Sequence, residues 1–143
     1  MCYAQGRPLK GVENFLDELN LKEEGDYVST FNGALVQDAH TGKPISHLTL
    51  DYEDLCDLYD LSVEVGSRSH FYDTRTVYTF NRDVSDYTIL EAYLTGVHLN
   101  VTELDEVPKD IAMSKFMMID HPEILNECIK KNTRRILRKI HNR

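Results

Sequence analysis

The sequence predicts an α/β protein. Its most informative stretch is Tyr27–Leu50, where an Asn-Gly turn pair and a Gly/Pro loop separate three β-rich runs: Tyr27–Phe31, Ala34–Asp38 and Ile45–Leu50. A helical pattern precedes this stretch, and helical and β patterns alternate after it. Because such alternation favours helices packed on sheets, we expect a layered α/β architecture. The 143 residues are enough for one domain with a stable core.

The N-terminal part carries the first expected helix. After Pro8, a residue suited to the first turn of a helix, apolar side chains recur at helical spacing: Leu9, Val12, Phe15, Leu16 and Leu19. We therefore expect a helix over Pro8–Leu19. The charged segment Lys22–Asp26 contains a glycine and is expected to be the loop that leads into the first β run.

A second helix is expected over Asp51–Val65. Asp51 is a suitable N-cap, and Asp54 stands at the second position of a capping box. The apolar residues expected to face inward are Leu55, Leu58, Tyr59 and Leu61 or Val65. Acidic residues share another face: Asp54, Asp57, Asp60 and Glu64. A metal site there is the alternative to a solvated face, but no histidine or second carboxylate cluster accompanies these acids.

The rest of the chain alternates short strands with helices. Strands are expected over His70–Asp73 and Val77–Phe80, followed by a helix that begins at Ser85 or Asp86 and ends before Gly96. The residues of this helix expected to face inward are Ile89, Leu90, Tyr93 and Leu94. The remaining expected elements are a strand over Val97–Val101, an acidic loop over Thr102–Asp110, a strand over Lys115–Ile119 and a helix from Pro122 through Ile129.

Composition and charge exclude several classes of protein. With 41% apolar and 28% charged residues the chain is typical of soluble globular proteins. It has no apolar run of about 18 residues and no signal segment, so we expect no membrane partner and a cytoplasmic location. Cys2, Cys56 and Cys128 are too far apart for a Cys-x-x-Cys zinc site and odd in number. Residues 1–129 carry 9 basic and 24 acidic residues, which disfavours nucleic acid as a partner.

Several motifs occur in an order that resembles the Cof-type (class IIB) sugar phosphatases of the haloacid dehalogenase (HAD) superfamily. Gly6-Arg7-Pro8, a helix, and a strand ending in Asn32-Gly33-Ala34 are similar to the Thr-Gly-Arg-Pro and Asn-Gly-Ala motifs that close two core strands in that family. The likeness continues through residues 76–83 and 115–120 and fades after Lys131. It implies that residues 1–50 are a remnant of a Rossmannoid HAD core and residues 51–131 an incomplete α/β cap domain of the C2 type.

The resemblance also implies a chemistry. Family members hydrolyse phosphomonoesters with an Asp nucleophile in an Asp-x-Asp motif, a second Asp as acid/base, a Ser or Thr that holds a phosphoryl oxygen, a Lys, and late Asp residues that bind Mg²⁺. The nucleophile motif is absent here, and the Lys and metal-binding acids lie beyond the cap in the family. Because this hydrolysis needs accelerations of up to ~10²¹, we expect no catalytic residue, no bound Mg²⁺ and no activity in this chain alone.

Candidate substrate-binding residues come from the same motifs. Gln5 stands where the family has the Thr that contacts phosphate, and its longer side chain would place its donor differently. By the resemblance, Arg7, Asn32 and Gly33 are expected to line the substrate cleft, although a surface ion pair is an equal alternative for Arg7. Four residues of the cap are expected to face a sugar phosphate, the arginines by bidentate contacts: Arg75, Arg82, His70 and Asp73.

The chain ends in a basic tail, residues 132–143, where the resemblance stops. Residues 130–143 carry seven basic groups and no acid. One interpretation is an amphipathic helix, with Ile136, Leu137 and Ile140 on one side, that contacts an anionic membrane or RNA. The other is an out-of-frame segment, because suitable codons shifted by one base encode Ile-Pro-Glu-Glu-Phe-Phe-Glu-Lys-Tyr-Thr-Ile, a run similar to what such caps carry next.

The expected function is therefore that of a truncated HAD-like hydrolase whose intact parent acts on a phosphorylated small metabolite of the sugar-phosphate class. The alternatives are a non-enzymatic binding module that uses the basic tail and a nonfunctional gene product. An unfinished sheet leaves an open edge, and such edges favour self-association.

Overall fold

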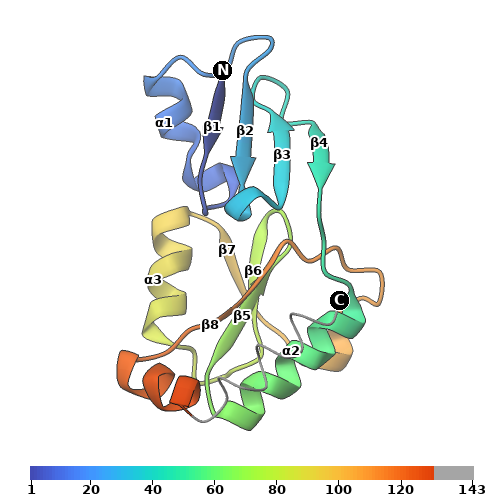
Figure 1. Ribbon diagram of the computed structural model, residues 1–143, viewed down its shortest axis with the longest axis vertical. Helices are drawn as coiled ribbons and strands as arrows, with labels where there is room; N and C mark the ends of the chain where they lie inside the picture. Colours follow the sequence, from blue (N-terminus) through green and yellow to red (C-terminus); the bar gives the residue numbers. More distant parts are fainter. Residues whose placement is uncertain (131–143) are drawn as a thin grey trace.

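The computed structural model describes residues 1–130 and shows two sheets, one above the other, each with its own helices (Figure 1). We call residues 1–50 the first lobe and residues 51–130 the second lobe. The sheet of the first lobe has the order β1-β2-β3-β4, and that of the second lobe has the order β7-β6-β5-β8. Both sheets mix parallel and antiparallel pairs, so the predicted α/β class is confirmed. The basic tail predicted over residues 132–143 lies outside the described residues.

The first lobe is built on the predicted hairpin and on one strand that the sequence did not reveal. Its elements are β1 (Cys2–Ala4), η1 (Leu9–Gly11), α1 (Glu13–Glu18), β2 (Tyr27–Thr30), η2 (Phe31–Gly33), β3 (Leu35–Asp38) and β4 (Pro44–His47). Strand β1 pairs parallel with β2, while β2, β3 and β4 pair antiparallel. The side chains of Val12, Leu16 and Val28 are fully buried between α1 and the sheet.

The helix predicted over Pro8–Leu19 is shorter than expected and is divided in two. The 3-10 helix η1 is followed by α1, and Val12 between them has a φ of −128°, far from helical values. Next to Val12 the chain packs closely against the second lobe, because a Cβ at Gly11 would stand only 3.3 Å from the Cα of Thr95. Local spacing does not indicate such a contact.

The second lobe follows the predicted order of elements. These are α2 (Tyr52–Val65), β5 (Ser69–Tyr72), β6 (Thr76–Thr79), α3 (Asp86–Thr95), β7 (His98–Val101), η3 (Leu104–Glu106), β8 (Lys115–Met118) and a helix over residues 122–130. The predicted capping box at the start of α2 is confirmed, because the Asp54 N–H donates to Asp51 Oδ1 at 2.9 Å and the Asp51 N–H to Asp54 Oδ2 at 3.3 Å. Gly66, in the left-handed conformation, ends α2.

Helices α2 and α3 cover opposite faces of the second sheet (Figure 1). Alternate residues of β5 and β6 point to each side, so Phe71 and Phe80 pack with Leu55 of α2. Tyr72 and Val77 pack with Ala92 of α3 on the other face. The apolar residues predicted to face inward on α2 are buried or half-buried: Leu55, Leu58, Tyr59, Leu61 and Val65.

The inward face predicted for α3 is wrong. Ile89, Leu90 and Leu94 are about half exposed and Tyr93 is 81% exposed, whereas the buried residues are Thr88, Ala92 and Thr95. Periodicity finds an apolar face of a helix but does not say which neighbour covers it. Here the helix lies close to the sheet and to Gly11, so small side chains occupy the contact and the large ones point outward.

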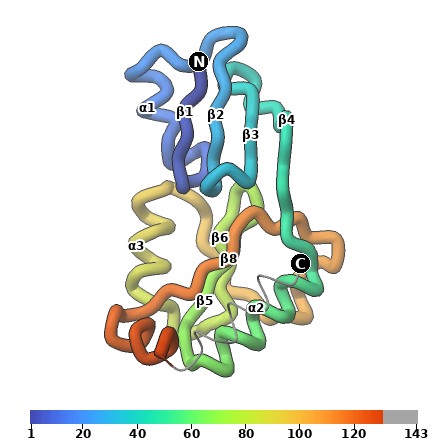
Figure 2. Tube along the Cα trace, in the orientation of Figure 1, coloured from blue at the N-terminus to red at the C-terminus, as the bar shows by residue number. Residues whose placement is uncertain are grey.

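The two lobes share one apolar cluster. Phe31 and Leu35 of the first lobe pack with Tyr72 and Val77 of the second, and the ring centroids of Phe31 and Tyr72 are 5.7 Å apart. The chain passes from the first lobe to the second at Leu50, beside the segment that leads into β8 (Figure 2), and there Leu50 and Met113 exchange two main-chain hydrogen bonds. No helix within residues 1–130 is long and apolar enough to cross a membrane.

The outward face of α3 gives a test by stability. Because Ala92 is buried against the sheet, Ala92→Leu is expected to lower the free energy of unfolding by about 1–3 kcal/mol through overpacking. Tyr93→Ala removes a large aromatic side chain, but it should change the free energy of unfolding by less than about 0.5 kcal/mol, since Tyr93 is exposed. Urea denaturation of both variants measures this. The reverse order of effects would contradict the orientation of α3.

Candidate functional site

The candidate site lies at the junction of the two lobes, where the loops after β1 and β2 meet. Three main-chain hydrogen bonds hold the two loops in place: Gln5 N–H to Ser29 O at 2.9 Å, Asn32 N–H to Gln5 O at 3.3 Å and Phe31 N–H to Arg7 O at 3.3 Å. The structure thus brings together four of the predicted residues, which we call the junction loops: Gln5, Arg7, Asn32 and Gly33. These residues are half-buried or exposed.

The residue types of the junction loops follow from their backbone geometry. Asn32 has a φ of +58° and Gly33 a φ of +97°, which is the left-handed region that asparagine and glycine tolerate best. Gly6 lies close to the Asn32 side chain: a Cβ at Gly6 would stand 2.5 Å from Asn32 Oδ1, so the amide would have to move. The predicted simple turn at Asn32-Gly33 is in fact the 3-10 turn η2, which carries these residues toward the second lobe.

Gln5 uses part of its side chain to close its own loop. Its Oε1 accepts a hydrogen bond from the Arg7 N–H at 3.0 Å. The Nε2 amide is then the donor that the side chain has for an anion. The altered phosphate position predicted from the sequence is therefore compatible with an anion contact through Nε2.

Two of the residues predicted in the second lobe lie at the end of the sheet that faces the junction. Asp73 and Arg75 belong to the turn between β5 and β6, and the Asp73 carboxylate accepts the N–H groups of Arg75 and Thr76 at 2.6 and 2.7 Å. Asp73 Oδ2 also accepts the Tyr78 hydroxyl at 3.0 Å. Asp73 therefore orders the turn, and Arg75 is an exposed residue of this turn.

Arg82 and His70 lie elsewhere. Arg82 follows β6 at the opposite end of the sheet, where it is exposed and its Nη2 lies 3.4 Å from Glu103 Oε1. His70 is 0% exposed, and its Nδ1 forms a hydrogen bond of 2.9 Å with Thr88 Oγ1 while its Nε2 has no partner among the described residues. Burial lowers the pKa of His70 to about 4, with a smaller effect from Lys115, so the ring is neutral at pH 7.

A polar cluster that the sequence did not indicate lies on the α3 face of the second sheet. The Tyr72 hydroxyl donates to Glu91 Oε1 at 3.5 Å, and Lys115 Nζ stands 5.5 Å from the centroid of the Tyr72 ring. Burial raises the pKa of Tyr72, and the Glu91 charge adds to the effect. Burial lowers the pKa of Lys115, while Glu91 opposes it. The three residues come from β5, α3 and β8, so only tertiary pairing brings them together.

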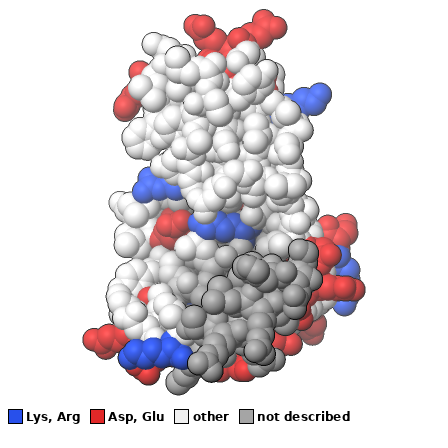
Figure 3. Space-filling model, in the orientation of Figure 1, with Lys and Arg blue, Asp and Glu red and all other residues white. Residues whose placement is uncertain are grey.

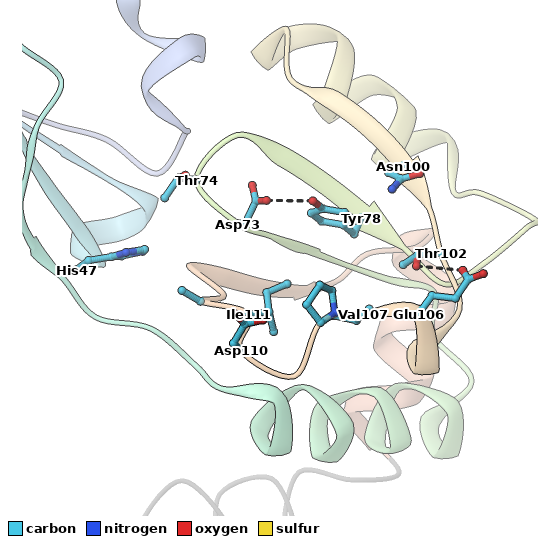
Figure 4. A pocket seen from close by; sticks show the side chains of 12 residues that line it. His47, Asp73, Thr74, Tyr78, Asn100, Thr102, Glu106, Val107, Asp110 and Ile111 are labelled. Carbon is cyan, nitrogen blue, oxygen red and sulfur yellow. Dashed lines mark hydrogen bonds between the residues drawn. The ribbon is translucent and has the colours of Figure 1, made fainter.

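A cavity of about 540 Å³ opens on the other face of the sheet (Figure 4). Its walls come from β6, β7, the β5–β6 turn, the segment 102–112 and His47 of β4, and it carries Asp73, Glu106 and Asp110 but no lysine or arginine. Three carboxylates without a cation repel a phosphate. A second cavity, also about 540 Å³, is lined by Arg68 and by the predicted Arg82. Arg68 is paired with both Asp83 and Asp120, and Arg82 with Glu103. Neither cavity is suited to the anion expected from the sequence.

The residues of the junction loops do not fit a magnesium site. Mg²⁺ requires carboxylate and other oxygen ligands in octahedral geometry, and these loops contain no carboxylate. Within residues 1–130, no group of three or more His, Cys, Asp or Glu side chains could hold a metal ion.

The chain belongs to the family of haloacid dehalogenase-like hydrolases, since the family model matches residues 1–142. Among curated proteins it is 54% identical over 124 residues to "Putative phosphatase YxeH" of Bacillus subtilis, covering 87% of this chain and 46% of that protein. "Putative phosphatase M6_Spy0533" of Streptococcus pyogenes serotype M6 is 38% identical over 129 residues, covering 90% of this chain and 47% of that protein. The chain thus spans about half the length of these relatives.

Solved structures agree with the fold. A haloacid dehalogenase-like hydrolase from Bacteroides thetaiotaomicron matches with a TM-score of 0.76 at 20% identity, over 94% of this chain and 50% of that one. A second match, described as the HAD subclass IIB sugar phosphatase BT4131, has a TM-score of 0.59 at 19% identity, over 90% of this chain and 48% of its own. The family model that matches residues 1–142 confirms the predicted membership of the HAD superfamily.

The buried His70 predicts a pH dependence of stability. Its folded pKa of about 4 lies below the unfolded value of about 6.5, so the unfolded chain binds a proton first and stability falls as the pH drops below about 6.5. Between pH 7 and pH 5 the loss from this residue should be about 2 kcal/mol, above the range in which carboxylates titrate.

The measurement is urea denaturation at both pH values. His70→Gln should lose correspondingly less stability over this interval, and His98→Gln, at an exposed position, should behave as the wild type. A wild-type loss that persists in His70→Gln would show that another group causes it.

Proposed function

We propose that this chain is the substrate-holding part of a phosphoric monoester hydrolase, with the junction of the two lobes as the substrate cleft. The observation that carries the proposal is the meeting of Gln5, Arg7 and Asn32 at the junction, together with membership of the hydrolase family. The side-chain amides of Gln5 and Asn32 and the guanidinium of the half-buried Arg7 suit a phosphate, which accepts several charge-assisted hydrogen bonds.

In this proposal residues 1–50 belong to the Rossmannoid core of the enzyme and residues 51–131 to an incomplete cap domain. The support is that each part has its own sheet and its own buried cluster and that they meet along one apolar contact. Cleft residues supplied by both parts are Arg7, Asn32 and Gly33 from the core and Arg75 from the cap. Arg82 remains a predicted contact but lies at the far end of the sheet.

The proposed substrate of the whole enzyme is a small phosphorylated metabolite of the sugar-phosphate class, handled in the cytoplasm. The description of one structural neighbour as a sugar phosphatase supports this class. The catalytic groups are not among the residues of this chain: the sequence contains no Asp-x-Asp motif, and its junction loops do not fit Mg²⁺. We therefore propose that the 143-residue chain binds phosphate but does not hydrolyse phosphomonoesters.

Activity is tested with p-nitrophenyl phosphate and Mg²⁺. The purified chain is expected to release no p-nitrophenol above the uncatalysed rate, because it lacks a nucleophile for the phosphoryl group. If hydrolysis co-purifies with the chain and persists after other phosphatases have been removed, this part of the proposal is wrong.

Binding is tested by titration of the ¹⁵N-labelled chain with inorganic phosphate. The amide resonances of the junction loops are expected to shift, and Arg7→Ala should weaken binding about tenfold, since a hydrogen bond to a charged group contributes about 1.5–3 kcal/mol. Lys43→Ala, at an exposed site in the β3–β4 loop, is the matched control and should bind as the wild type. Phosphate binding that leaves the junction loops unshifted would place the anion elsewhere.

A further inference from the structure

Lys115 stands at the junction end of the second sheet. It is the first residue of β8 and lies opposite Tyr72, the last residue of β5 before the turn. The Tyr72 ring in turn contacts Phe31, whose N–H donates to Arg7 O at 3.3 Å. The ammonium of Lys115 is thus connected to the Arg7 loop through two aromatic side chains. Figure 3 shows basic and acidic side chains next to each other at the waist between the lobes.

Lys115 forms no direct ion pair within the part of the chain that the structure describes, although it is half-buried. Two arginines of the second lobe differ in this respect: Arg68 is paired with Asp83 and Asp120, and Arg82 with Glu103. Burial lowers the pKa of Lys115 more than the charge of Glu91 raises it, so an anion in contact with the ammonium would stabilise its charged form.

The surroundings of Lys115 hold it in position. Tyr72 is 1% exposed and is fixed between Phe31 and His70, with ring centroids 5.7 and 5.4 Å away. Its hydroxyl is directed at Glu91, so the ring face remains beside the Lys115 ammonium. A cation placed on a rigid aromatic ring loses little freedom when a ligand binds.

We propose that Lys115 is the contact that the second lobe makes with the phosphate of the substrate, and that Glu91 beside it accepts a hydrogen bond from a hydroxyl of the same molecule. The pair would select phosphomonoesters whose organic part carries hydroxyl groups near the phosphate. The inference rests on the proposed function, because it assumes that the phosphate lies at the junction.

The experiment repeats the phosphate titration with Lys115→Met, which keeps the length and apolar character of the side chain. Loss of one charged contact should weaken phosphate binding about tenfold, or ~1.4 kcal/mol. Lys109→Met is the matched control, because Lys109 Nζ also lies over a tyrosine ring, 4.3 Å from the Tyr52 centroid, but away from the junction. It should bind phosphate as the wild type does.

A second variant tests the role of Glu91. Glu91→Gln removes a negative charge near the anion, so inorganic phosphate should bind equally or more tightly. In the wild type glucose 6-phosphate should bind more tightly than inorganic phosphate because of its hydroxyls, and in Glu91→Gln this difference in affinity should disappear. If Glu91→Gln lowers the affinity for both ligands by the same factor, the proposed hydroxyl contact is wrong.

The outcomes separate this inference from the proposed function. If Arg7→Ala weakens phosphate binding but Lys115→Met does not, the inference is overturned and the cleft remains. If Lys109→Met weakens phosphate binding as much as Lys115→Met does, the loss of affinity comes from the change in net charge, and the inference is again overturned. If phosphate shifts no resonance of the wild-type chain, both the inference and the proposed cleft are wrong.

Discussion

The contact between Phe31 and Tyr72 is the interaction on which the rest of the structure depends. It lies in the one apolar cluster that residues of both sheets share, and burial of a large apolar side chain contributes about 1.5–3 kcal/mol. It helps to hold the loops after β1 and β2 against the end of the second sheet, together with the close approach of Gly11 to Thr95 and the main-chain bridge between Leu50 and Met113. The same contact fixes Tyr72, and through it the position of Lys115, so packing and candidate chemistry have a common origin.

The charged groups of the chain fall into two kinds according to their partners. Carboxylates such as Asp51 and Asp73 accept main-chain N–H groups and stabilise a helix start and a turn. Asp120 is buried, which alone would raise its pKa, but hydrogen bonds from the Arg68 and His121 N–H groups and the Arg68 charge lower it overall. These pairs are structural. The half-buried cations Arg7 and Lys115 have no such carboxylate pair among the described residues, and they are the ones that we propose to contact the phosphate.

Much of the fold could be predicted because its signals are local. The box at Asp51 and Asp54 and the left-handed Gly66 mark the ends of α2 in the sequence itself, and alternating runs mark the strands. The junction loops were also predictable, since Asn32 and Gly33 need positive φ and the motif around Arg7 has a family resemblance. β1 was not, because three residues carry too little pattern to be recognised without their partner β2.

Apart from β1 and the division of the first helix, the amino-acid sequence by itself determined which segments are helices and strands, and which two loops carry the phosphatase-like motifs. It could do so because capping, turn chemistry and side-chain periodicity act over a few residues. Only the tertiary structure decided which face of α3 is buried, that His70 is closed off from solvent, and that Arg82 lies far from Arg75. It alone joined Tyr72, Glu91 and Lys115. Each of these depends on which strand or helix lies opposite, and that choice is made by long-range pairing and close packing between lobes.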